Sequence, residues 1–293
     1  MYWQGVIGVM FLYVWLAAAI FMIIKTPSGT PRWDLVIEAL AWPAVSVLIC
    51  NILSVRPRLR EFKQRDAQSR VMSTNHPEWY KILQEFQRLC GMKKPPEMYI
   101  LPEERPFIFT MPAKGGTIVV SRGLMDKLKP AENVALVAHE VGHIVARHTR
   151  MEMAIIFIRG ANPVWKLILL PVTLMSVLMR GWIDAIDYTA DRCAYLLTGG
   201  QARLVNAAIV KHALAMTPDA GVSMEELDEF LTRPGDVEQD QKLLEQQIRI
   251  SRFISEVPNL RDRIEALGEF AKSEQAQQLL ERLSQLRTGA TGM

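Results

Sequence analysis

The 293-residue chain is predicted to be an α+β protein, mainly helical, with a small β-sheet and a two-helix transmembrane hairpin before it. Three observations predict this class: two apolar runs within residues 1–55, short β-branched segments within residues 98–121, and helical patterns after residue 130. Hydrophobic residues make up 49% of the chain, and the formal net charge is only +3, which does not indicate a nucleic-acid partner. Its three cysteines are widely spaced, so neither a disulfide framework nor a cysteine metal site is expected, and a reducing compartment fits.

The N-terminal hairpin is predicted from two runs that are each long enough to cross a bilayer. Met1–Ile24 has no charged side chain, and Leu35–Val55 has only Glu38, near one end. A span needs about 20 apolar residues. A cleavable signal peptide is the alternative for the first run, but it would need a positive charge before the run and small residues after it. No such charge is present, and Ala17–Ala19 lies inside the run.

Residues 56–75 are predicted to be a basic juxtamembrane linker. Its positive side chains are Arg56, Arg58, Arg60, Lys63, Arg65 and Arg70. Positive flanks stay on the cytoplasmic side, so both termini and the domain that follows are expected at the cytoplasmic face of the inner membrane, in a multi-pass protein. Contact with anionic lipid is favoured over nucleic-acid binding, because no aromatic residues are interleaved with these charges. The lipid bilayer is therefore an expected partner.

The core domain is predicted over residues 76–218. Apolar residues at helical spacing indicate a helix over His76–Gly91, which Pro95 and Pro96 follow. Three short strands are expected, over Met98–Leu101, Pro106–Thr110 and Thr117–Ser121. A helix over Ala131–His148 follows, with Pro130 suited to its first turn. This helix is apolar on more than one face, so it is expected to be buried.

The C-terminal region, residues 219–293, is predicted to be helical and to pack on the core. Acidic and basic residues alternate there on helical patterns, with helix starts at Asn259 and Ser273. The last helix has a leucine stripe formed by Leu279, Leu280, Leu283 and Leu286. Packing of this stripe against its own domain is favoured over a partner site.

A metal-binding pattern lies within the buried helix, where residues 139–143 read His-Glu-Val-Gly-His. His139 and His143 are four residues apart and share one helix face, so both imidazoles can bind one Zn²⁺. Glu140 lies beside them and can hold a water molecule at the metal and take its proton. The alternative is a helix whose histidines are merely hydrogen-bonded, but burying these polar groups without a partner is costly. Gly142 costs about 1 kcal/mol relative to Ala, which close approach by substrate or a neighbouring helix would explain.

A catalytic zinc usually takes three protein ligands, so a third must come from elsewhere in the chain. Three aspartates, Asp184, Asp187 and Asp191, share one face of a helix that is predicted over Trp182–Leu197. A solvated acidic face is the alternative, although the neighbouring residues are largely apolar.

These segments together resemble the HtpX-like and CAAX-prenyl-protease-type membrane zinc metallopeptidases. In that family a glutamate, three residues and an aspartate follow the helix motif, and these positions fall on Asp187 and Asp191. The resemblance implies a zincin-like domain in which His139, His143 and Asp187 bind one zinc ion and Asp191 supports a ligand histidine. It also implies that Thr117, Ile118, Val119, Val120 and Ser121 form an edge strand, which would pair with an extended substrate.

The chain departs from the family at several positions. Asp187 is one methylene shorter than the family's glutamate, and Pro106–Thr110 replaces an Asn-Ala-Phe stretch. Near the C-terminus the family's histidine is missing, but Arg263 matches an arginine. Arg263 could contact the oxyanion or substrate, or form a surface salt bridge. His148 lies beside the ligands but is rotated off their helix face, which favours a supporting role.

The predicted function is zinc-dependent endopeptidase activity at the membrane, with Glu140 as general base and membrane-associated or damaged proteins as substrates. A non-catalytic membrane adaptor or chaperone that keeps a structural zinc helix is the alternative. A prenyl-protein processing enzyme would need a large intramembrane chamber, for which two spans are too few. The apolar stretch Met153–Trp182 is too short for two crossings, so it is expected to be a core element or a membrane contact. The oligomeric state stays open.

Overall fold

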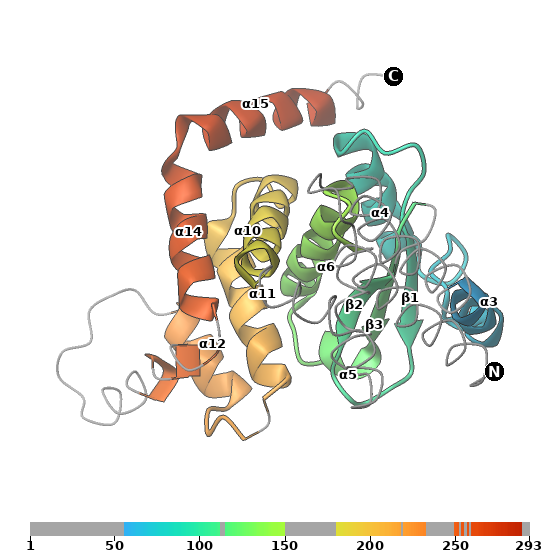
Figure 1. Ribbon diagram of the computed structural model, residues 1–293, viewed down its shortest axis with the longest axis horizontal. Coiled ribbons are helices and arrows are strands. Elements are labelled where there is room, and N and C mark those ends of the chain that lie inside the picture. The colour runs from blue at the N-terminus through green and yellow to red at the C-terminus, as the bar shows by residue number, and fades with distance from the viewer. Residues whose placement is uncertain are drawn as a thin grey trace, which may run out of the picture. The chain divides into compact units, whose positions relative to one another are not determined.

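The computed structural model describes residues 56–111, 115–149, 180–217, 219–232 and, with short gaps, 249–288 (Figure 1). Helix α3 (Arg56–Arg65) belongs to one compact unit, and the described residues from Asp66 onward belong to a second. Within these residues no helix has the length and apolar character that a membrane crossing requires. The predicted hairpin over residues 1–55 and most of the apolar stretch 153–182 lie outside the described residues.

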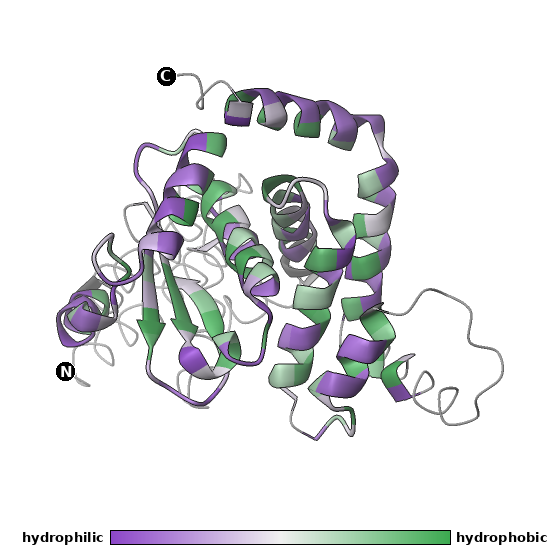
Figure 2. Cartoon of the chain, turned by 180° about the vertical axis from the view of Figure 1, so that it is seen from behind, coloured by the Kyte–Doolittle hydropathy of each residue, from purple (hydrophilic) through white to green (hydrophobic). Residues whose placement is uncertain are grey.

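Helix α3 is formed by the basic segment that follows the predicted hairpin. Five of its ten residues are Arg or Lys, and its first turn has no acidic residue. Colouring by hydropathy shows this helix as mostly hydrophilic, whereas the strands are largely hydrophobic (Figure 2). The first half of the predicted linker is therefore helical.

The second unit contains a three-stranded sheet among its described residues, formed by β1 (Glu97–Leu101), β2 (Ile108–Met111) and β3 (Thr117–Ser121). The order is β1-β3-β2, with β1 parallel and β2 antiparallel to β3. Every residue of β3 is buried, which suits its β-branched sequence. The prediction that Thr117–Ser121 is an edge strand is wrong, because β3 is hydrogen-bonded to a neighbour on both sides. In the described residues β1 and β2 are the two outer strands, and a bridge between Arg70 and Tyr99 covers part of β1.

Helix α6 (Pro130–Val145) follows the sheet and is the most buried helix of the described fold. Pro130 occupies its first turn, and the backbone N–H of Lys129 donates to Glu132 Oε2 at 2.8 Å, which secures the helix start. All residues from Ala135 to His143 are buried. The helix ends at Val145, three residues before the predicted end at His148. Arg147, just beyond it, adopts a left-handed backbone with φ of 60°, which is incompatible with a continuing helix.

Helix α10 (Arg180–Leu197) packs along α6 (Figure 1). The two helices approach closely at Gly142, where an added Cβ would lie 2.8 Å from the Cα of Ala190 and 3.0 Å from the Cβ of Cys193. A neighbouring helix is thus the reason for glycine at this position, one of the two explanations that the sequence offered. Helices α11 (Ala202–Ala215) and α14 (Leu260–Lys272) pack against α6 and α10, respectively.

Helix α15 (Glu274–Thr288) joins the C-terminal region to the core, next to α4 (Pro77–Leu89). Arg287 donates to the carbonyl of Leu197 at 2.6 Å and to Glu85 at 3.0 Å, and Arg88 donates to the carbonyl of Leu286 at 2.6 Å. Of the predicted leucine stripe, Leu279, Leu280 and Leu283 pack against the core, whereas Leu286 is 50% exposed. Packing of the stripe on its own domain is therefore confirmed for three of the four leucines.

A buried ion cluster ties α12 (Met224–Thr232) to α6 and α11. Lys211 is 1% exposed, and its Nζ lies 2.7 and 2.9 Å from the two carboxylate oxygens of Glu132. The same ammonium group contacts Asp228, which also forms a 3.1 Å ion pair with Lys129. The cluster holds three helices together, and no signal in the sequence predicted it.

Candidate metal and catalytic site

The two histidines of α6 point their ring nitrogens at one another, one turn apart. His139 Nε2 and His143 Nε2 are 3.1 Å apart, and both side chains are buried. In a tetrahedral zinc site, bonds of about 2.1 Å place neighbouring ligand atoms roughly 3.4 Å apart. The observed spacing therefore fits two ligands of a single ion. Burial and the neighbouring His139 and His148 lower the pKa of His143 to about 2, so its imidazole is neutral and able to bind a cation.

Asp187 brings a carboxylate to the same place from α10. Its Oδ1 lies 3.7 Å from His143 Nε2, and one ligand atom from each of His139, His143 and Asp187 lies within 4.8 Å of the others. The side chain of Asp187 is 35% exposed, whereas both histidines are buried, so solvent reaches the group through Asp187. Two imidazoles and one carboxylate are a ligand set that zinc takes in hydrolytic enzymes. The residues present therefore fit zinc.

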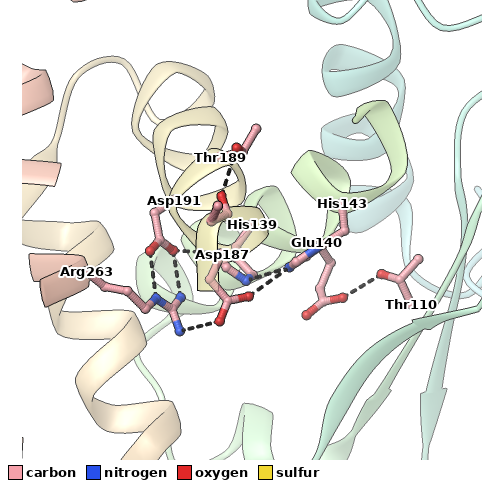
Figure 3. A network of polar contacts seen from close by, with 9 residues as sticks. Thr110, His139, Glu140, His143, Asp187, Thr189, Asp191 and Arg263 are labelled. Atoms are coloured by element: carbon pink, nitrogen blue, oxygen red, sulfur yellow. Dashed lines mark hydrogen bonds and ion pairs between the residues drawn. The ribbon is translucent and has the colours of Figure 1, made fainter. Parts of the chain in front are cut away.

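Asp191 lies one helical turn after Asp187 and fixes the orientation of His139 (Figure 3). Its Oδ1 is 2.7 Å from His139 Nδ1, so Nδ1–H donates and Nε2 is left to face His143. Burial opposes the charge of Asp191, yet Arg263 and His139 together lower its pKa to about 2. Burial likewise disfavours protonation of His139, but Asp191 outweighs this and raises the pKa of His139.

Arg263 of α14 is committed to these two carboxylates. Its Nε and Nη2 each donate to Asp191 at 2.7 Å, and its Nη1 lies 3.6 Å from Asp187 Oδ2 (Figure 3). The side chain is only 17% exposed, so the alternative of a surface salt bridge is excluded. Such a bidentate contact fixes the position of the Asp191 carboxylate and stabilises its negative charge.

Glu140 lies beside the histidines and is held by a strand residue. Thr110 of β2 donates its hydroxyl to Glu140 Oε2 at 2.5 Å, and both side chains are buried (Figure 3). Burial raises the pKa of Glu140 despite this hydrogen bond and the nearby His139. The sequence placed Thr110 on a strand but did not predict a role for it. Only the position of β2 beside α6 reveals the contact.

Of the remaining predicted residues, the structure describes the contacts of His148 but not those of the Asp184 side chain. The ring of His148 meets that of His143 edge to face, with centroids 5.8 Å apart, and its backbone N–H donates to the carbonyl of His143 at 3.0 Å. His148 is therefore a neighbour of a ligand histidine. The side chain of Asp184 lies outside the described part of the chain.

A helix with paired histidines and a glutamate, joined by a carboxylate from a second helix, defines a candidate metallopeptidase site. The model of peptidase family M48 matches residues 73–271, which include all of these side chains, and the chain belongs to that family. It is similar to a protease HtpX homolog of Thermoplasma acidophilum, 40% identical over 76 residues. It is also similar to proteases HtpX of Ectopseudomonas mendocina and Pseudomonas entomophila, 34% identical over 74 and 86 residues.

These similarities extend over short segments. They span 25%, 24% and 28% of this chain and 24%, 25% and 28% of the three relatives, in the same order. The chain thus matches only about a quarter of the length of these curated relatives. No solved structure matches the chain.

Proposed function

We propose that this protein is a membrane-anchored, zinc-dependent endopeptidase that hydrolyses peptide bonds with Glu140 as general base. One observation supports this most directly. Two imidazole Nε2 atoms 3.1 Å apart and the Asp187 carboxylate converge next to the buried carboxyl group of Glu140. Membership of peptidase family M48 agrees with this activity. Its substrates would be proteins or peptides at the cytoplasmic face of the inner membrane, including damaged ones.

His139, His143 and Asp187 would hold a single Zn²⁺ in this proposal. Such an ion supplies Lewis acidity, which lowers the pKa of a water molecule and polarises a peptide carbonyl. Asp187 has a shorter side chain than the glutamate expected in this family, so its backbone must lie closer to the histidines. The contact of α10 with Gly142 provides that approach, because no side chain separates the two helices there.

Glu140 would take a proton from the attacking water and return it to the leaving amine. Thr110 occupies Oε2 of the carboxylate, so Oε1 is the oxygen available for the proton. The raised pKa of Glu140 suits both steps, because a group that binds protons more readily near neutral pH can accept one and then release it. Asp191 and Arg263 would keep His139 and Asp187 in place and would not touch the substrate.

An extended substrate would add to the sheet at β2 by β-augmentation. In the described residues β3 is central, so β2 offers the sheet edge on the side of Thr110. Phe109 of this strand is 38% exposed, and its ring lies 5.8 Å from that of Phe107. These two rings provide an apolar surface beside the edge for side chains of a bound peptide.

The test of the proposal is Glu140→Gln in the full-length protein in detergent, with an unfolded protein as substrate. Loss of a general base costs about 10²- to 10⁴-fold in rate. Zinc content should stay near one ion per chain, because Gln keeps the shape of Glu. The matched control is Glu269→Gln on the exposed side of α14, which should cleave normally. Unchanged cleavage by Glu140→Gln would refute the enzyme and favour the adaptor with a structural zinc.

A further inference from the structure

The backbone of β2 presents hydrogen-bonding groups on both of its sides. Ser121 of β3 donates its N–H to the carbonyl of Phe107 at 3.0 Å, so the backbone groups of Phe107 face β3. These groups alternate sides along an antiparallel strand, which turns those of Phe109 to β3 as well and those of Ile108 and Thr110 away from it. No hydrogen bond joins these outward groups to another described residue. They are therefore available to an added strand.

The side chains of β2 point to the two faces of the sheet in turn. Thr110 points to α6, where its hydroxyl meets Glu140, and Ile108 packs against the hydrophobic core (Figure 3). Phe109 therefore lies on the opposite face of the sheet, as Phe107 does. Phe109 is 38% exposed, and the two rings are 5.8 Å apart with an interplanar angle of 35°. This second face thus carries a half-exposed aromatic pair at the outer strand.

We propose that Phe109 selects substrates that carry a large apolar side chain opposite it in the added strand. The inference rests on the proposed binding of a peptide at β2, and it names the class of substrate. Side chains of an added strand alternate as those of β2 do, so the residue opposite Phe109 contacts its ring. Its two neighbours in the peptide point to the face of α6 and the histidines. The preferred substrate is an extended segment with an aliphatic or aromatic residue at this one position.

The surroundings of Phe109 favour an apolar side chain over a polar one. On its inner side Phe109 is paired with Val119 of β3, which is fully buried. On its outer side the ring stays partly exposed, and an apolar side chain would remove this surface from water. A charged side chain would lose water there without gaining a partner from Phe107 or Phe109. Thr110 of the same strand holds Glu140, so a peptide in this register lies beside the candidate site.

The test measures peptide binding to the full-length Glu140→Gln protein in detergent, which keeps the site but lacks the base. The probe is a short fluorescein-labelled peptide of Ser, Ala and Lys with a single Leu, compared with a copy in which Ala replaces the Leu. Fluorescence anisotropy should give a dissociation constant about 3- to 5-fold lower for the Leu peptide. Adding Phe109→Ala should bring the ratio of the two constants near one. Phe109→Thr, which keeps a β-branched residue in the strand, should do the same.

Leu286→Ala is the matched control, because Leu286 is 50% exposed on α15. It removes an exposed apolar side chain from another element and should keep the full preference. The proposal is overturned if the parent protein binds both peptides equally, or if the preference survives in both Phe109 variants. Cleavage of unfolded casein by the wild-type protein is measured separately. A preference that depends on Phe109 without cleavage would refute the peptidase alone, and cleavage without that preference would refute this inference alone.

Discussion

Gly142→Ala tests whether the contact between α6 and α10 sets the geometry of the site. An alanine Cβ would lie 2.8 Å from Ala190 Cα and 3.1 Å from the carbonyl oxygen of Ala190. Both atoms are backbone and cannot rotate away. Ordinary van der Waals contact begins at about 3.4 Å, so α10 must move by about 0.6 Å. Metal sites tolerate deviations of only about 0.2 Å in ligand distance. Zinc affinity should therefore fall about 10- to 100-fold.

Stability should respond to two opposing effects in this variant. Replacing a mid-helix glycine by alanine favours the helix by about 1 kcal/mol. Overpacking against α10 costs about 1–3 kcal/mol. The free energy of unfolding of the metal-free protein should therefore stay unchanged or fall by up to about 2 kcal/mol. Urea denaturation measures this quantity, and competition with a chromophoric chelator measures zinc affinity.

Gly268→Ala is the matched control for these measurements. Gly268 is also inside a helix, α14, but an added Cβ would meet no atom within 4 Å. This variant should gain about 1 kcal/mol of stability with unchanged zinc affinity. If Gly142→Ala gained as much stability as the control and bound zinc equally well, the close approach of the two helices would not govern the site.

Three further variants test the surroundings of the site. Thr110→Val removes the hydrogen-bond donor to Glu140, so kcat should fall about 10-fold with little change in KM, since a buried hydrogen bond contributes about 1–2 kcal/mol. Thr110→Ser keeps the hydroxyl group and should restore the rate. Equal activity of the Val and Ser variants would contradict a role for this hydrogen bond. Lys211→Met leaves the Glu132 and Asp228 carboxylates without their shared cation. The free energy of unfolding, measured by urea denaturation, should fall by about 3–5 kcal/mol. A loss below about 1 kcal/mol would show that the ion cluster does not stabilise the fold. Burial lowers the pKa of His212 to about 4, so its contribution to stability is complete above about pH 6.5 and is lost progressively towards pH 4, as the unfolded chain takes up a proton first. His212→Gln should therefore lose less stability between pH 7 and pH 4, by at most about 3 kcal/mol, and an unchanged pH dependence would contradict this assignment.

The local sequence predicted the elements that carry the site. The apolar period and Pro130 indicated α6 within a few residues of its observed ends, and the β-branched run predicted β3 over Thr117–Ser121, as observed. The spacing of His139 and His143 required no tertiary information, because four residues make about one helical turn. These features depend on short-range backbone geometry, so neighbouring residues suffice to predict them. The transmembrane hairpin stays a prediction.

The arrangement of these elements could not be predicted in the same way. Strand order depends on pairing between segments, and a buried β-branched strand can occupy the centre of a sheet or its edge. An edge position was therefore assigned to β3, although β3 is central, and the outer strand β2 places Thr110 against Glu140. The sequence likewise gave two open roles for Arg263, and packing of α14 against α10 directed it to Asp187 and Asp191.

The sequence by itself determined the chemistry available to this protein: two imidazoles and a carboxylate on one buried helix, at a spacing that helix geometry makes suitable for a metal. The family resemblance named Asp187, Asp191 and Arg263, but only the tertiary structure decided how these distant groups contact the histidines, and it added Thr110. Asp187, Asp191, Arg263 and Thr110 come from three other elements, and their approach depends on helices packing closely at Gly142 and on the order of three strands. The physical reason is that contacts between distant segments are selected by the packing of the whole core, which no short stretch of sequence contains.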